Sequence, residues 1–245
     1  MELPGTPSDT VEGVLAAGRG DISTVFVSMA ARHPEGLDAE YLRWHTLDHR
    51  PEQHRLSAVR ASLRLVSTPE CRAARWGGDD RFDAVDHVMS YFFSDPAGLT
   101  TFNDLSIALG DAGRKLRLLP PVERGVYTVG DRSAAPRIKV GADVLPWWPV
   151  LGVILLLERE APTTEELLEV DGVAGVWSTS TSVTHGSFAG APQGQHLTYC
   201  FLDDDPVVTA GRMDAVVRNR WTGGGPLLAA PFYPVIPHQW DRRVP

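Results

Sequence analysis

The chain has 245 residues, 43% of them hydrophobic, and a formal net charge of −8 at pH 7. This length suits one large domain or two domains of about 100 to 120 residues each. The net negative charge, with no basic stripe interleaved with aromatic residues, argues against a nucleic-acid partner. We therefore expect a globular protein with a proper hydrophobic core.

Cysteine usage and hydropathy favour a cytoplasmic location. Cys71 and Cys200 are the two cysteines and show no metal-ligand spacing, so we expect reduced thiols. Residues 1–20 lack the basic and apolar segments of an ordinary secretory signal and read as a flexible arm. The most apolar run, 150–157, is too short to span a bilayer and predicts a buried strand. No membrane partner is expected.

The first half of the chain predicts the element order βαββαβ. Residues 59–66 alternate in period two, which indicates a half-buried strand. Asp95-Pro96 begins a helix that Gly113 ends. The predicted strands cover residues 24–31, 59–68, 84–94 and 125–129, and the predicted helices cover residues 38–50 and 95–112.

The helix predicted over 38–50 has distinct start and stop signals. The Asp38 side chain is a suitable N-cap, because its carboxylate can accept from the free amides of the first turn. Pro51 cannot donate to the helical ladder and disfavours helical geometry at Arg50. We expect the helix to end or kink near Arg50.

One face of this helix concentrates aromatic and ionisable side chains. Tyr41, His45 and His49 are spaced i, i+4 and i+8, and Trp44 lies beside them. Two stacked histidines with aromatic neighbours suggest a functional site, because a core built only for stability would use Leu or Ile at these positions. The alternative is an ordinary buried face in which each histidine is hydrogen-bonded.

The second half repeats the order of the first, which predicts an internal duplication. Both halves open their second helix with Asp-Pro, here Asp205-Pro206. The predicted units are residues 21–132 and 150–245, the latter with a C-terminal tail, joined by a Pro-rich connector over 133–149. The predicted strands of the second half cover 151–158, 172–184, 195–202 and 226–236, and its predicted helices cover 163–169 and 205–221.

Two βαββαβ units make two ferredoxin-like sandwiches whose bare sheet faces need cover, and packing sheet against sheet closes a barrel. This α+β architecture resembles the dimeric α+β barrel superfamily, with a tandem pair in place of a homodimer. The first helix resembles the EthD-like branch, which has an aromatic residue, Trp four residues on, His four further on and then Pro. Tyr41, His49 and Pro51 match this motif, whereas His45 stands where the family has Trp.

The resemblance implies a small-molecule pocket between a sheet face and its helices, in the first half only. Relatives include cofactor-independent monooxygenases, polyketide cyclases, lactone isomerases and haem-dependent peroxidases. We expect an enzyme without cofactor or metal that acts on a small hydrophobic, aromatic or polyketide-like molecule, as a monomer or homodimer. His49 would be the general base or acid. The candidate catalytic residues are His49, His45 and His87, and the candidate substrate-binding residues are Tyr41, Trp44, Tyr91 and Arg64.

Arg64, or Arg60 on the same strand, would stabilise developing negative charge if its face is the pocket face. Solvent exposure or a surface ion pair is the alternative for both.

Two other functions stay open. In the first, the protein is a non-catalytic binding or scaffold protein of the same fold, and its histidines are structural. In the second, His185 or His196 is the axial ligand of a haem. A zinc site is not expected, because residues 46–48 between His45 and His49 lack the glutamate of a zinc-protease helix.

Overall fold

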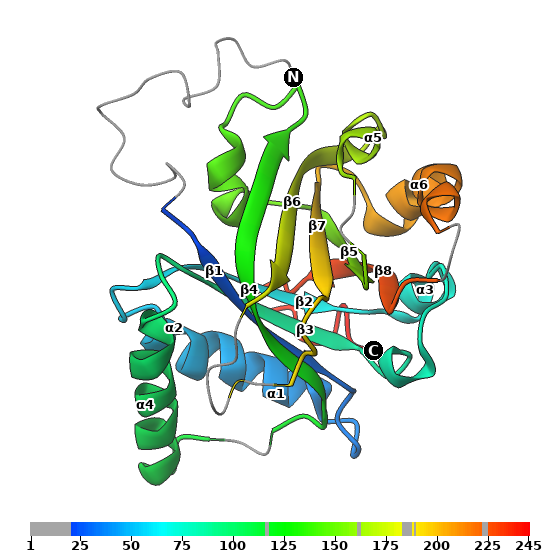
Figure 1. Cartoon of the computed structure of the whole chain (residues 1–245). Helices are drawn as coiled ribbons and strands as arrows, with labels where there is room; N and C mark the ends of the chain where they lie inside the picture. Colours follow the sequence, from blue (N-terminus) through cyan, green and yellow to red (C-terminus); the bar gives the residue numbers. More distant parts are fainter. Residues whose placement is uncertain (1–20, 116–117, 161–162, 183–187, 189, 222–224) are drawn as a thin grey trace.

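The computed structural model describes residues 21–115, 118–160, 163–182, 188, 190–221 and 225–245 (Figure 1). Within these ranges eight antiparallel strands form a closed barrel in the order β1-β3-β2-β8-β5-β7-β6-β4. The strands are β1 (Thr24–Ala30), β2 (Val59–Val66), β3 (His87–Phe93), β4 (Pro121–Ala134), β5 (Gly152–Glu158), β6 (Val173–Thr181), β7 (His196–Leu202) and β8 (Leu228–Pro234). The α+β class and the closed barrel predicted from the sequence are thereby confirmed. The predicted arm, residues 1–20, lies outside the described residues.

The strand pairing has the same pattern in both halves of the chain. In the first half β1 pairs with β3 and β4, and β3 pairs also with β2. In the second half β5 pairs with β7 and β8, and β7 pairs also with β6. The pairs β2–β8 and β4–β6 join the halves and close the barrel.

The interior of the barrel is filled by one apolar cluster. Alternate residues of all eight strands contribute to it, as the period of two requires. Phe92, Trp177 and Tyr199 are among its largest fully buried members. The Tyr199 hydroxyl lies 2.8 Å from the Ser90 hydroxyl, so its polar end is satisfied inside the barrel. The interior is therefore a packed core, and a binding site is to be sought outside it.

Helices cover these outer faces, one set for each half (Figure 1). The helices and turns are α1 (Asp38–Trp44), η2 (His45–His49), α2 (Arg50–Gln53), α3 (Pro69–Ala73), η3 (Asp80–Phe82), α4 (Gly98–Asp111), η4 (Ala142–Trp147), α5 (Glu165–Leu168) and α6 (Pro206–Arg220). Phe102 of α4 packs on Phe26 and Tyr91 of the first half. Met213 and Val217 of α6 belong to a separate cluster with strands of the second half. No helix in the described ranges is long and apolar enough to cross a membrane.

The strand β4 differs most from its prediction. It runs over Pro121–Ala134, whereas the prediction was residues 125–129. Its first part pairs with β1 and its later part with β6, with a register shift between Val129 and Arg132. The predicted connector over 133–149 therefore begins inside β4 and contains η4. Cys71 and Cys200 are buried free cysteines, as expected.

Candidate functional site

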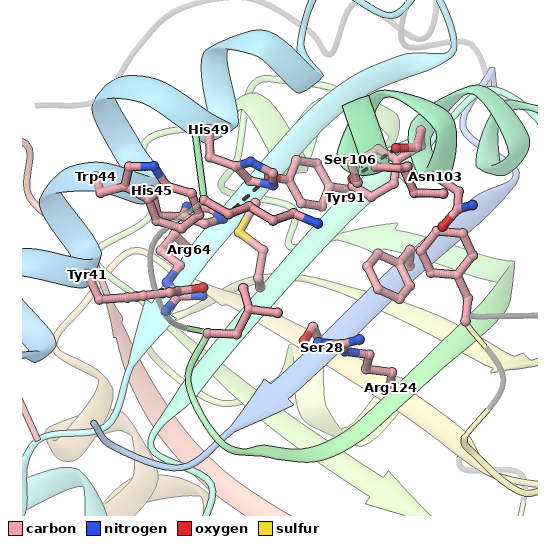
Figure 2. Close-up of a pocket in the computed structure, with 17 residues that line it drawn as sticks. Ser28, Tyr41, Trp44, His45, His49, Arg64, Tyr91, Asn103, Ser106 and Arg124 are labelled. Atoms are coloured by element: carbon pink, nitrogen blue, oxygen red, sulfur yellow. Dashed lines mark hydrogen bonds between the residues drawn. The ribbon is translucent and has the colours of Figure 1, made fainter. Parts of the chain in front are cut away.

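A cavity of about 200 Å³ lies between the outer faces of the first four strands and the helices α1, η2 and α4 (Figure 2). Six of the seven predicted site residues line it, namely Tyr41, Trp44, His45, His49, Arg64 and Tyr91. His87, the seventh, does not line it. The cavity is smaller than the 300 to 1,000 Å³ usual for drug-sized ligands, so it suits a molecule of one or two rings.

The helix that carries the histidines contains a π turn at the cavity. The Arg50 amide donates to the His45 carbonyl, five residues back, over η2. Pro51 has no amide hydrogen and would crowd a carbonyl four residues back, and the wider turn accommodates it at the start of α2. Of the two predicted alternatives, an end or a kink near Arg50, the helix does not end there but continues to Gln53, and its regular α-helical geometry is interrupted over His45–His49. Such π turns frequently occur at functional sites.

His45 is buried against β3, with 4% of its surface exposed. Its Nε2 lies 3.5 Å from the Tyr91 hydroxyl, at the limit of a hydrogen bond. Its Nδ1 has no hydrogen-bond partner among the described residues. Burial lowers its pKa well below the ordinary value, and Arg64 lowers it further. His45 is therefore a neutral imidazole near neutral pH.

His49 is half-buried, and its ring stacks on that of Trp44, with centroids 5.1 Å apart. Its Nε2 is 3.4 Å from the side-chain amide nitrogen (Nε2) of Gln53. The same Gln53 nitrogen donates to the Ser106 hydroxyl at 3.0 Å. Its Nδ1 is buried and unpartnered within the described chain. Burial, reinforced by Lys115, lowers the pKa of His49 to about 4. This ring too is neutral at neutral pH and able to accept a proton.

Arg64 projects from β2 toward this helix, so its strand face is the cavity face. Only 5% of its surface is exposed, whereas Arg60 on the same strand is exposed and pairs with Asp21. Its Cζ lies 5.1 Å from the centre of the Tyr41 ring. Its Nε is unpartnered among the described residues. Burial lowers the pKa of Arg64, yet a guanidinium stays charged in proteins.

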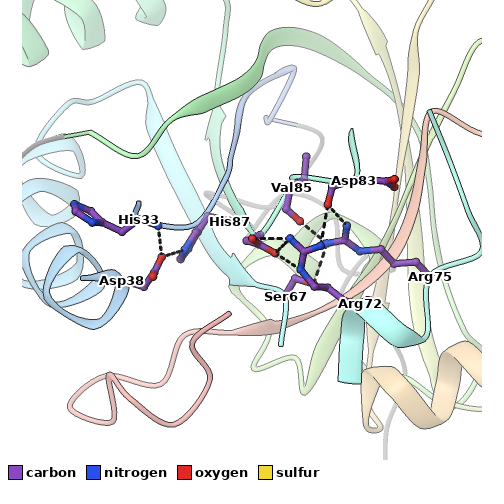
Figure 3. Close-up of polar contacts among 9 residues, drawn as sticks. His33, Asp38, Ser67, Arg72, Arg75, Asp83, Val85 and His87 are labelled. Carbon is purple, nitrogen blue, oxygen red and sulfur yellow. Dashed lines mark hydrogen bonds and ion pairs between the residues drawn. The ribbon is translucent and has the colours of Figure 1, made fainter. Parts of the chain in front are cut away.

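The carboxylate that compensates the charge of Arg64 is that of Asp38, and His87 links the two side chains. Arg64 Nη2 donates to His87 Nδ1 at 3.2 Å. On the other side of the ring, His87 Nε2 lies 2.7 Å from the Asp38 carboxylate, as Figure 3 shows. Since Nδ1 accepts, Nε2 carries the proton and donates to Asp38. Burial lowers the pKa of His87 to about 4, although Asp38 opposes this shift. His87 is therefore a neutral bridge at the back of the site.

Asp38 does not cap its helix, contrary to the prediction. Leu37 is at the N-cap position, and the Asp38 carboxylate accepts from His87 and, at 2.8 Å, from the His33 amide. Burial alone would raise the pKa of Asp38, but these hydrogen bonds lower it overall. The neighbouring Asp86 is held by Arg72 at 2.7 and 2.8 Å. Asp38 is thus the carboxylate linked to Arg64.

The sequence did not single out several other residues of the cavity wall. Ser28 and Arg124 are register partners on β1 and β4, and they lie together at one side of the cavity (Figure 2). Asn103 and Ser106, three residues apart on α4, form part of the opposite wall. The register of β4 would have revealed Arg124, but the predicted strand began one residue after it.

The described residues do not fit a haem in this cavity. Of the two candidate axial ligands, His185 lies outside the described residues. His196 is on β7, in the other half, and does not line the cavity. At about 200 Å³ the cavity suits a ligand smaller than a haem. Among the described residues, no group of three or more His, Cys, Asp or Glu side chains is placed to hold a metal ion.

No protein-family model and no curated protein matches the chain. A solved structure described as "Putative Chlorite dismutase" has a TM-score of 0.50 at 9% identity, covering 88% of this chain and 95% of its own. An anthrone oxidase-like protein has a TM-score of 0.44 at 12% identity, with 90% and 94% coverage. A "Putative monooxygenase" of Fusobacterium nucleatum has a TM-score of 0.48 at 10% identity, with 91% and 94% coverage.

Identities this low bear on the fold and not on the reaction. The first of these similarities shows that the two chains share their overall fold, which in this chain is a closed eight-stranded antiparallel barrel with helices on its outside.

Proposed function

We propose that the protein is an enzyme that removes a proton from a small aromatic or polyketide-like substrate bound in the cavity. The observation that carries this proposal is the pair of neutral imidazoles, one buried (His45) and one half-buried (His49), beside the buried guanidinium of Arg64. A base and a fixed cation at one cavity are the two groups that proton abstraction to an oxyanion needs.

His49 is the proposed general base. A hydroxyl or activated carbon of the substrate gives its proton to a ring nitrogen of His49, and the electron pair stays on the substrate as a phenolate or enolate. The product of this step is an imidazolium beside an anion, which raises the affinity of His49 for the proton while the anion is present. Cofactor-independent oxygenation, cyclisation and isomerisation can all start from such an anion.

Arg64 is the proposed stabiliser of the anion. Its guanidinium is fixed by His87 and Tyr41 before the substrate arrives, so little reorganisation is needed when charge develops. His87 and Asp38 are proposed to position Arg64 and not to touch the substrate. Tyr91, whose pKa burial raises, remains a hydroxyl donor close to His45.

The proposed ancestry is a tandem pair of ferredoxin-like units of the EthD-like type. The recurrence of one pairing pattern in β1–β4 and β5–β8 supports a duplication. The positions of Tyr41 and His49 at the cavity support the EthD-like motif. One chain closes the barrel without a partner, and the proposed assembly is a monomer or a homodimer. The proposed location is the cytoplasm.

The test is a turnover screen of phenols, anthrones and lactones with the wild type, His49→Ala and His54→Ala. The control residue His54 follows α2 directly and is exposed. Its Nε2 lies 2.7 Å from the Ser62 hydroxyl, outside the cavity. Loss of general-base catalysis lowers a rate by roughly 10²- to 10⁴-fold, so His49→Ala should lose turnover and keep its fold. His54→Ala should keep both.

Two results would count against the proposal. If His49→Ala fails to fold, His49 is structural, and His49→Gln, which keeps the volume and a hydrogen-bonding group, then tests catalysis alone. If ligands bind but no compound is converted, the protein is a non-catalytic binding protein of the same fold.

A further inference from the structure

The cavity wall has a charge opposite to that of the whole protein. Arg64, Lys115 and Arg124 line it, and no Asp or Glu is among its described lining residues. The chain as a whole carries a net charge of −8. Composition therefore does not explain a cationic cavity, and its positive charge is a local feature that attracts anions.

Arg64 has an N–H group without a hydrogen-bond partner among the described residues, which implies that a ligand in the cavity supplies the acceptor. A guanidinium carries five N–H groups, of which Nη2 donates to His87, and a further hydrogen bond joins Arg64 to the Tyr41 side chain. Its Nε is unpartnered within the described residues, although the side chain is 95% buried. The Asp38 carboxylate is bound to His87 and to the His33 amide, so it reaches Arg64 only through the His87 ring. Buried donors of this kind are normally satisfied, so a ligand oxygen is the partner to expect.

The strand register puts two arginines at the ends of one row across the sheet. Arg64 pairs with Met89, Met89 with Ser28, and Ser28 with Arg124. Three strand spacings separate the outer two backbones, roughly 14 Å. The long arginine side chains therefore flank a floor formed by Met89 and Ser28, which is wide enough for an aromatic ring.

The remaining wall is apolar and aromatic. Phe26 and Phe102 have ring centroids 5.8 Å apart in an edge-to-face arrangement, and Tyr91 packs on Phe102 at 4.7 Å. Such rings favour a flat apolar body between the charged ends. His45 and His49 add no competing charge, because both are neutral.

We infer that the ligand of this cavity is a small aromatic molecule with an ionised oxygen group, a carboxylate or an acidic phenolate, bound by Arg64. Arg124 lies at the opposite end of the row and binds a second oxygen substituent. This inference rests on the proposed function only for the location of the site. It adds that recognition depends on the charge of the ligand.

The experiment compares a charged and a neutral probe of the same shape. Binding of naphthalene-2-carboxylate and naphthalene-2-carboxamide is measured by isothermal titration calorimetry at pH 7.5 and low salt. A charge-assisted bond to a buried arginine predicts that the carboxylate binds roughly tenfold tighter or more. A second arm uses 4-nitrophenol, whose absorbance reports its ionisation. Preference for the phenolate would lower its apparent pKa on binding.

Matched variants assign the preference to a residue. Arg64→Gln should remove the preference for the carboxylate, and Arg124→Gln should reduce it. Arg60→Gln, on the same strand but exposed, should leave it unchanged. Melting temperatures check that each variant folds. If Arg64→Gln does not fold, Arg64→Lys, which keeps the charge but loses the planar fork, should keep part of the preference.

Equal binding of the carboxylate and the carboxamide would overturn the inference and leave the proposed proton transfer intact. Failure of the carboxylate and the phenolate to bind at all would also overturn it. A charge preference that depends on Arg64, without turnover of any compound, would uphold the inference and contradict the proposed function.

Discussion

The two halves of the barrel share one pairing pattern but differ in what covers their outer faces. The registers of β1–β3 and β5–β7 align Phe26 with Ile154 and Tyr91 with Cys200. The registers of the other pairs extend this correspondence. It matches Ser28 with Leu156, Arg64 with Ser178 and Arg124 with Ala229. Most of the positions that line a cavity in the first half hold aliphatic or small residues in the second.

The helices that cover the outer strand faces also differ between the two halves, since those of the second half pack closely on the sheet and those of the first half leave a cavity. In the second half Ile154, Leu156 and Cys200 pack with Met213 and Val217 of α6 into an apolar cluster. The helix α5 covers only Glu165–Leu168, so it contributes little. In the first half, the longer helix run from α1 to α2 brings histidines to the sheet and leaves a cavity. Buried charge and unpartnered polar atoms oppose stability, so the cavity of the first half carries a cost in stability that the apolar cluster on α6 does not.

The largest expected difference is in how much the free energy of unfolding falls when residues at corresponding positions of the two halves are truncated to Ala. Leu156→Ala removes a fully buried side chain and should lower the free energy of unfolding by about 2 to 5 kcal/mol. Its counterpart Ser28→Ala lies at the cavity and should change that free energy by less than about 1 kcal/mol. Urea unfolding of both variants measures the contrast. Equal costs would mean that Ser28 belongs to a packed core.

Acidification should destabilise the first half through its neutral histidines. The pKa values of His49 and His87 are about 4 in the fold, below the ordinary value near 6.5. Between these values the unfolded chain binds protons that the folded chain does not, so stability falls as pH falls from about 6.5 to 4. Each histidine contributes at most roughly 3 kcal/mol to this loss.

The measurement is the melting temperature of the wild type, His49→Gln and His87→Gln between pH 4.5 and 7.5. Each variant should lose less stability than the wild type over this range. An identical slope in all three proteins would contradict the burial of neutral imidazoles.

A smaller effect is expected from removing the counter-charge of Arg64. Asp38→Asn keeps an acceptor for His87 but leaves the guanidinium uncompensated, and it should lower the free energy of unfolding by about 1 to 3 kcal/mol. The control Glu52→Gln breaks ion pairs with Arg55 and Arg114 at the surface and should change little. Equal effects of the two substitutions would show that Asp38 does not compensate a buried charge.

Patterns local in sequence predicted most of the fold. The period of two in 59–66 located β2, and Asp205 caps α6 by accepting from the Val207 and Val208 amides. The later part of β4 was missed because it pairs with β6 across a register shift. Pairing between distant strands leaves no signal in either strand alone.

The site was predictable where it depends on helical spacing and hidden where it depends on sheet register. Tyr41, His45 and His49 were found because their spacing survives the π turn, with the two imidazoles 5.5 Å apart. The burial of Arg64 could not be decided from the sequence, because Arg60 and Arg64 lie on the same face of β2 and only the part of that face around Arg64 is covered. His87 shares a strand face with Tyr91, but only the fold puts Arg64 between His87 and the cavity.

The central claim is that the outer face of the first four strands holds the ligand. The most direct test is a thermal-shift screen of phenols, anthrones, lactones and aromatic acids against the wild type and Ser28→Leu, which puts the second-half residue type on the cavity floor. We predict that at least one compound raises the melting temperature of the wild type and has no effect on Ser28→Leu, which itself remains folded. A compound that stabilises both proteins equally would place the ligand elsewhere and contradict the claim.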